Sequence, residues 1–197
     1  MKWQFVFLLF AASTAVTFSQ NNDSNIQRYL PIVNIGLSSG SNNFTSYIGL
    51  LAEVNPVKNT TILGGVGYGP WGVKSSVGMR YYHKYPKGIY CGLSFSSCAG
   101  RNNDTLSLET FISDSVKNQD VILNLKKART LNLTLGYDWQ FWKRFRFFVE
   151  LGYSIPLQKD PYEIISKGIV LTESGKQSIY QMEPGGYIFG WGLTVGF

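Results

Sequence analysis

The sequence predicts an all-β protein that folds as an eight-stranded antiparallel up-and-down transmembrane β-barrel. Three observations lead to this prediction: repeated segments in which apolar residues alternate with small or polar ones, a last segment that ends on an aromatic residue, and an apolar leader. Strands of about ten residues with one apolar and one polar face are typical of membrane barrels, because lipid and lumen lie on opposite sides of the wall.

The closing segment, residues 187–197, shows the alternation most clearly. Its even positions are mostly glycine or threonine, too small to build a hydrophobic face. A period of two over this length indicates a strand with one apolar face, and the nearly bare second face suits a narrow lumen. The odd positions are all large and apolar: Tyr187, Phe189, Trp191, Leu193, Val195 and Phe197.

The composition excludes several other classes of protein. Among 197 residues only 15% are charged, 21 are glycine, and the formal net charge is +6. The mean hydropathy of −0.04 is too polar for a helical membrane protein, and no apolar run after the leader approaches the ~20 residues of a spanning helix. An ordinary soluble surface or a disordered chain would carry more charge, roughly a quarter of its residues.

The leader, residues 1–19, is predicted to be a secretory signal peptide, followed by one barrel domain over residues 20–197. Lys2 supplies the positive start, residues 3–12 the apolar core, and Thr17 and Ser19 the small residues before cleavage. A transmembrane anchor is the alternative, but the core is short and no basic residues follow it. The mature chain is therefore expected in an oxidising compartment.

Four alternating segments precede residue 85, and short turn-forming stretches rich in Gly, Pro, Asn and Ser separate them. The third is rich in glycine, yet Ile62, Val66 and Tyr68 keep the outward apolar positions. The segments are residues 30–38, 45–54, 61–69 and 73–83.

Four more segments complete the set. Between the fifth and the sixth lies a polar stretch, residues 98–120, and between the seventh and the eighth a longer loop, residues 156–186. The segments are residues 89–97, a sixth that ends near residue 141, 145–155 and 187–197.

The turns after the second, fourth and sixth strands are short, which assigns them to the periplasmic end, whereas both long loops fall at the outer end. The soluble alternative, an exported lipocalin-like barrel, would need apolar residues inside and polar residues outside. Here the polar and glycine-rich face is the one that suits the interior, so the membrane barrel is favoured.

The inward positions predict a plugged lumen. Large side chains at Tyr47, Tyr90 and Phe148 would fill an interior that in eight-stranded barrels is just wide enough for side chains. The hairpin about Trp142 should place Asp138 and Arg146 directly opposite each other; the alternative is that the inward charges merely fill wet space. The charged inward residues, which we expect to form one ion-pair network, are Glu53, Arg80, Asp138, Arg146 and Glu150.

The two cysteines are expected to stay unpaired, with Cys91 on the lipid face. On one extended strand Cys91 and Cys98 would stand ~23 Å apart, beyond the reach of a disulfide, unless the chain turns back between them. The sequence has no cluster of Cys and His that would indicate a metal site, and no cofactor is expected.

A basic cluster, Lys126, Lys127 and Arg129, precedes the apolar part of the sixth strand at its outer end. These residues either bind the phosphates of lipopolysaccharide through charge-assisted hydrogen bonds or are simply solvated strand ends, and the two interpretations stay open. Nucleic acid is not an expected partner, because the remaining positive charge is scattered.

With a signal peptide, eight amphipathic strands and a terminal Phe197, the sequence resembles small outer-membrane barrels of the OmpX and OmpA-barrel type. The resemblance implies a monomer in the outer membrane of a Gram-negative bacterium, in contact with membrane lipid and lipopolysaccharide, with a structural, adhesion or surface-interaction role towards an unknown surface partner. It also implies that the barrel assembly machinery reads the closing strand, through Tyr187, Phe189, Trp191 and Phe197.

The alternatives to this role are a lipid-A-modifying enzyme and a narrow pore. Acyl-transfer chemistry needs a nucleophile beside a base, usually histidine. The one imidazole, His83, is followed by Lys84 and Tyr85 and lies beside a predicted periplasmic turn, where it suits an interfacial position. We therefore expect no enzymatic activity.

Overall fold

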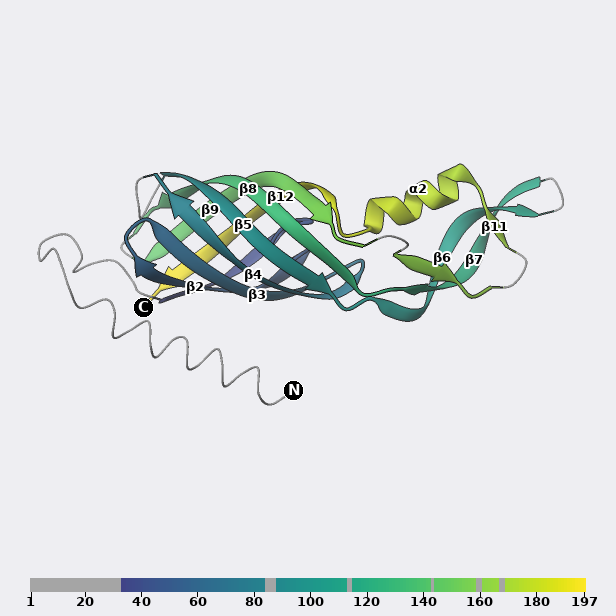
Figure 1. Cartoon of the computed structure of the whole chain (residues 1–197), viewed down its shortest axis with the longest axis horizontal. Coiled ribbons are helices and arrows are strands. Elements are labelled where there is room, and N and C mark those ends of the chain that lie inside the picture. The colour runs from purple at the N-terminus through teal and green to yellow at the C-terminus, as the bar shows by residue number, and fades with distance from the viewer. Residues whose placement is uncertain (1–32, 84–87, 113–114, 143, 159–160, 167–168) are drawn as a thin grey trace, which may run out of the picture.

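The computed structural model describes residues 33–83, 88–112, 115–142, 144–158, 161–166 and 169–197. The predicted signal peptide and the first residues of the predicted first strand lie outside this part of the chain. The described residues form a closed barrel and a smaller second sheet, with a helix, that extends beyond one end of the barrel (Figure 1).

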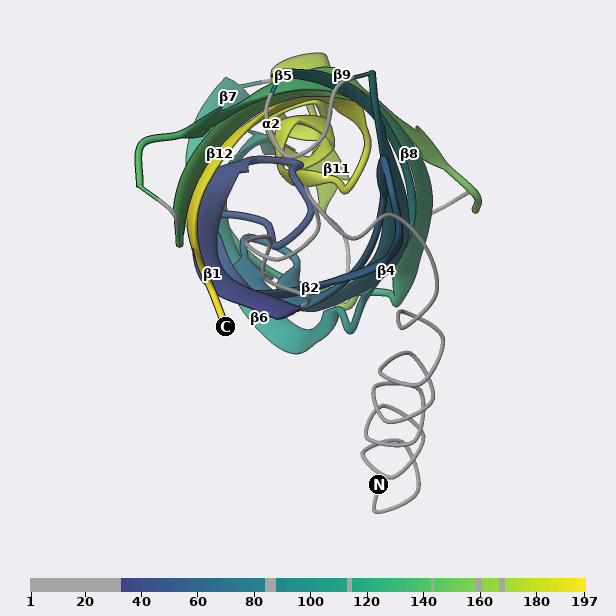
Figure 2. The same ribbon diagram turned by 90° about the vertical axis from the view of Figure 1, so that its left-hand side faces the viewer.

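Eight antiparallel strands close the barrel in the order β1-β12-β9-β8-β5-β4-β3-β2. Figure 2 looks along the barrel and shows these strands as a ring. The prediction of an eight-stranded antiparallel barrel is confirmed. The strands are β1 (Val33–Ser41), β2 (Ile48–Val57), β3 (Thr60–Gly69), β4 (Gly72–Tyr82), β5 (Gly88–Cys98), β8 (Ala128–Gln140), β9 (Phe145–Pro156) and β12 (Gly186–Gly196).

The segments expected as two long loops instead build the second sheet, so that expectation was wrong. Its strand order is β10-β7-β6-β11, with one helix in addition. We call the barrel end that carries it the sheet end, and the opposite end, with the β2–β3 and β8–β9 turns, the short-turn end. The elements are β6 (Arg101–Ile112), β7 (Ser115–Leu125), β10 (Tyr162–Ile164), β11 (Val170–Leu171) and α2 (Glu173–Met182).

The second sheet has a hydrophobic core of its own, which includes residues from the sheet end of the barrel. Thr172 caps the N-terminus of helix α2: its hydroxyl accepts a hydrogen bond from the Gly175 N–H (3.0 Å) and lies 2.9 Å from a carboxylate oxygen of Glu109 on β6. Burial of Ile179 then holds the helix against the sheet. The core consists of Trp71, Cys98, Leu108, Val121, Leu123, Leu125, Ala128, Leu171 and Ile179.

The barrel wall alternates between exposed apolar and buried polar side chains. On β8, Leu133 and Leu135 are exposed, whereas Asn132 and Asp138 are buried. The outward positions expected from the sequence are confirmed on the described strands. Tyr47 is the exception: it was expected inside, but it is 57% exposed because β2 begins only at Ile48.

The connection between β1 and β2, residues 42–47, folds into the barrel and buries Phe44. Lys74 Nζ donates to the carbonyl oxygens of Asn43 (2.6 Å) and Asn42 (3.1 Å), and Ser76 Oγ donates to that of Phe44 (2.6 Å). A Cβ at Gly65 would lie 2.7 Å from the Phe44 ring. The glycines of β3 therefore leave the space that this inward turn occupies.

Candidate functional site

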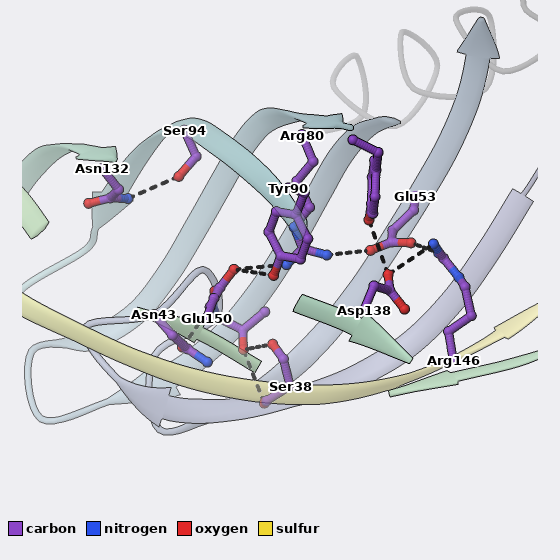
Figure 3. A network of polar contacts seen from close by, with 12 residues as sticks. Ser38, Asn43, Glu53, Arg80, Tyr90, Ser94, Asn132, Asp138, Arg146 and Glu150 are labelled. Atoms are coloured by element: carbon purple, nitrogen blue, oxygen red, sulfur yellow. Dashed lines mark hydrogen bonds and ion pairs between the residues drawn. The ribbon is translucent and has the colours of Figure 1, made fainter. Parts of the chain in front are cut away.

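Five charged side chains from four strands meet inside the barrel (Figure 3). They come from β2, β4, β8 and β9, and each lies at an inward position of its strand, because alternate residues of a strand face the same side. Each is at most 3% exposed. The residues are those singled out from the sequence: Glu53, Arg80, Asp138, Arg146 and Glu150.

The five form one continuous chain of ion pairs. Arg80 bridges Glu53 (2.8 Å) and Glu150 (3.0 Å). Arg146 in turn contacts Glu53 and lies 3.2 Å from Asp138. Glu53 therefore joins the two guanidiniums, and the signs alternate from Glu150 to Asp138 along the chain. Opposite charges this close offset part of the large cost of removing each from water.

Aromatic side chains surround this network. The Arg80 guanidinium lies 4.6 Å from the ring centroid of Tyr90 and 4.2 Å from that of Phe148, within cation–π range. The hydroxyl of Tyr90 donates to Glu150 (3.2 Å), and that of Tyr82 donates to Asp138 (3.1 Å). Tyr90, Phe148 and Arg80 fill the interior as expected. Phe44, and not Tyr47, is the further large side chain buried there.

The pairing of Asp138 with Arg146 follows a different register from the one expected. Asp138 lies opposite Phe148, and Arg146 lies opposite Gln140. The centre of the β8–β9 hairpin is therefore one residue later than Trp142, so the two charged side chains meet diagonally. The expectation of a direct cross-strand pair was wrong, although the ion pair itself forms.

A second polar cluster, which the sequence analysis did not single out, lies nearer the sheet end. Asn132 donates to Ser96 (2.8 Å) and Ser94 (3.2 Å), and it accepts from Ser154 (2.6 Å). The hydroxyl oxygens of Ser76 and Ser96 lie 2.7 Å apart. The signal that could have found this cluster is the run of small polar residues at inward positions of β4, β5, β8 and β9.

Two of the cavities lined by the described residues are small. A cavity between the charged network and the second polar cluster, lined by Phe44, Leu63, Arg80, Asn132 and Glu150 among others, measures about 10 Å³. That is about the volume needed to hold one water molecule. Where the end of α2 meets the barrel, near Lys74 and Met182, another cavity measures about 20 Å³.

A larger pocket of about 510 Å³ lies at the short-turn end, between the start of β5 and the end of β8. The described lining includes no Ser, Thr or Cys. The lining residues are His83, Gly88, Ile89, Tyr137, Asp138, Trp139 and Gln140.

The predicted surface residues lie outside the lumen. Lys126, Lys127 and Arg129 are exposed around the β7–β8 junction at the sheet end. The four aromatic residues of the closing strand are exposed on the outer wall: Tyr187, Phe189, Trp191 and Phe197.

Cysteines and metal ligands add no further site in the described chain. Cys91 is free and exposed on the outer wall, as expected, and Cys98 is free and buried. The described residues contain no group of three or more His, Cys, Asp or Glu side chains arranged to hold a metal ion. Among the described helices, none has the length and apolar character needed to cross a membrane.

Comparison with known proteins gives structural matches alone. No family model and no curated protein matches the chain. The N-terminal β-barrel domain of Pseudomonas aeruginosa OprF is similar with a TM-score of 0.48 and 15% identity, over 84% of this chain and 96% of that one. Acinetobacter baumannii CarO is similar with a TM-score of 0.46 and 9% identity, over 85% of this chain and 98% of that one.

Proposed function

We propose that this chain is an integral outer-membrane protein of a Gram-negative bacterium, with a plugged barrel that anchors the second sheet at the cell surface. Its role is then structural, adhesive or otherwise one of surface interaction. One observation carries the proposal: the barrel exposes its apolar residues and buries its charged ones. In water this arrangement would be unfavourable, because exposed apolar area and buried charge both cost free energy.

The dimensions of the barrel wall fit a bilayer. Strands of about ten residues, which rise about 3.3 Å per residue and tilt by about 40°, span roughly the 25 Å apolar band of outer-membrane barrels. Aromatic side chains are exposed near both ends, as at the two interfaces of a membrane. Those near the short-turn end include Tyr137, Trp139, Trp142 and Phe197, and those near the sheet end include Tyr47, Tyr68, Tyr153 and Tyr187.

The lumen supports an anchoring role in preference to transport. The ion-pair network crosses the barrel from β2 and β4 to β8 and β9, and the inward turn with Phe44 lies between the network and the sheet end. A permeant solute would have to displace both. A narrow pore is the competing proposal, and planar-bilayer conductance separates the two: we expect no large steady conductance, and a stable open channel would contradict the plug.

Membrane insertion is tested by a heat-modifiability gel together with fractionation. A folded barrel should migrate differently before and after boiling and should remain with the membrane after carbonate extraction. A soluble, unshifted protein in the periplasmic fraction would overturn the proposal.

Presentation of the second sheet at the surface is tested by labelling of engineered cysteines in whole cells. In a Cys91→Ser background, Asn118→Cys on β7 should react with a membrane-impermeant maleimide. Lys58→Cys, in the exposed turn between β2 and β3, is the matched control and should react only after the outer membrane is permeabilised. The reverse pattern would place the second sheet in the periplasm.

The proposal includes no enzymatic activity. Mass spectrometry of lipid A from cells with and without the chain is the corresponding test, and a change in acyl chains would instead support the lipid-A-modifying enzyme.

A further inference from the structure

We propose that the barrel rim above β5, β8 and β9 is a binding site for a membrane lipid whose headgroup carries an anionic phosphate. The ligands are Lys126, Lys127 and Arg129, which we call the basic rim. The inference rests on the proposed membrane location of the barrel and adds a specific lipid contact to it.

The basic rim lies directly beyond the apolar wall. Arg129 is paired with Ser97 of β5, and two residues further along β8, Leu131 is paired with Phe95 of β5 and with Ile155 of β9. Alternate residues of a strand share a face, so Arg129 projects to the same side as Leu131 and the exposed Leu133 and Leu135. A charged group and an apolar chain of one molecule can therefore contact this surface together.

The backbone of the basic rim is held in place. Lys126 N–H donates to the carbonyl of Pro161 (2.7 Å), and its own carbonyl accepts from the Trp71 indole (2.8 Å). Arg129 N–H donates to the side-chain oxygen of Gln158 (2.9 Å), and its carbonyl accepts from Leu157 N–H (2.9 Å). These bonds order the main chain while the cationic side chains point outward.

The cationic groups of the basic rim remain available. Within the described part of the chain, the side chains of Lys127 and Arg129 make no hydrogen bond or ion pair, and Lys126 has only a contact of 3.9 Å with Glu163. Arg101, on β6, is different: it pairs with Asp104 (3.3 Å) and contacts the Tyr68 hydroxyl. Lys127 and Arg129 therefore bring two unpaired cations to the β8 side of the sheet end.

Phosphate is the anion that suits these groups. A guanidinium offers two parallel N–H donors to phosphate oxygens, and a neighbouring ammonium adds a charge-assisted hydrogen bond. A free phosphate ion would gain only this polar part. A lipid also places its acyl chains along Phe95, Leu131 and Ile155, which is why we assign the site to a lipid.

Native mass spectrometry of the folded, detergent-solubilised protein tests the site, with dimyristoylphosphatidic acid as probe and dimyristoylphosphatidylcholine as the zwitterionic comparison. The parent should retain phosphatidic acid preferentially. The double variant Lys127→Gln, Arg129→Gln should bind it about tenfold more weakly, as expected for lost charge-assisted bonds. The matched control, Lys58→Gln with Arg144→Gln, removes two exposed cations near the short-turn end and should bind like the parent.

Equal retention by the parent and the rim variant would overturn the inference, and so would an equal loss in the control, which would reveal unspecific charge attraction. Displacement of the lipid by millimolar inorganic phosphate would assign the site to a free anion instead. The heat-modifiability gel is run on every variant. If the parent protein shows no gel shift, the membrane proposal is refuted. If the parent shows the gel shift but binds both lipids equally, only the proposed lipid site at the basic rim is refuted.

Discussion

The barrel and the second sheet use the same alternating pattern but bury opposite faces. On β8 of the barrel, Leu133 and Leu135 are exposed and Asp138 is buried. On β7 of the second sheet, Val121 and Leu123 are buried and Asp120 is exposed. A period of two therefore identifies a strand, but the surroundings decide which of its faces is covered.

The covering layer explains the difference. In the second sheet, helix α2 packs on the apolar face and buries Ile179 against it. In the barrel, no described element covers the outer wall, and the strands close on themselves around polar groups. We infer that lipid covers the wall as α2 covers the second sheet, which makes the two regions respond differently to the same substitutions.

The largest effect is expected in the lumen. Arg146→Ala leaves Asp138 without its cation and removes one of the two cations that contact Glu53, and loss of one partner from a buried pair costs about 3–5 kcal/mol. The double variant Asp138→Asn, Arg146→Gln retains hydrogen-bonding groups and should lose less. Urea unfolding in detergent micelles measures both, and a smaller loss for Arg146→Ala than for the double variant would contradict the network.

Truncation of Ile179 should weaken only the second sheet. Ile179→Ala removes buried methyl groups from its core and should cost roughly 2–5 kcal/mol. Hydrogen exchange should show lower protection of the β6–β7 hairpin, while the gel shift of the barrel persists. If the barrel strands lost protection to the same extent, the two regions would form one cooperative unit.

A charged residue introduced at an exposed position should distinguish the surroundings of the barrel wall from those of the second sheet. Leu135 on β8 is 61% exposed, and Asn118 on β7 is also exposed. Leu135→Arg should destabilise the barrel by about 2–4 kcal/mol if the residue faces the middle of a bilayer. Asn118→Arg faces water and should stay within about 0.5 kcal/mol of the parent.

Reversible folding into phospholipid vesicles, followed by urea titration, measures both free energies. Equal small effects would show that the outer wall of the barrel is not in contact with lipid.

Much of the barrel could be predicted because the alternation of inward and outward residues along a strand is a local property. The apolar positions of β4, β5 and β12 follow directly from alternation, and the same counting selects Glu53, Arg80 and Glu150 as inward residues. Which charge contacts which is less predictable, because it depends on register. A shift of one residue at the β8–β9 turn moved Arg146 opposite Gln140.

The inward turn and the second sheet were missed for different reasons. Phe44 lies in a stretch of turn-forming residues, and its burial depends on the space left by Gly65 on another strand. The alternation in β6 and β7 is mixed with exposed polar residues, and its apolar face is stabilised by α2, which is distant in sequence. A local signal for α2 was present in Thr172 and Glu173, an N-cap followed by an acidic residue.

The smallest effect on stability is expected at Phe197. Its side chain is 72% exposed at the end of the closing strand, while its backbone N–H donates to the Val33 carbonyl (2.9 Å). Phe197→Asp should therefore change the unfolding free energy in detergent by no more than about 0.5 kcal/mol, as is usual for surface positions.

In cells we expect the same substitution to lower the yield of folded barrel, because the resemblance of the closing strand to assembly-targeting strands implies that the terminal aromatic residue is read during insertion. Trp142→Ser is the matched control: Trp142 is also exposed (70%) at the short-turn end, but it lies outside the closing strand. Heat-modifiability of membrane fractions measures the yield. An equal loss of folded protein in cells and in detergent would show that Phe197 acts through packing. An equal loss of yield for Trp142→Ser would show that removal of any aromatic residue at this interface lowers the yield.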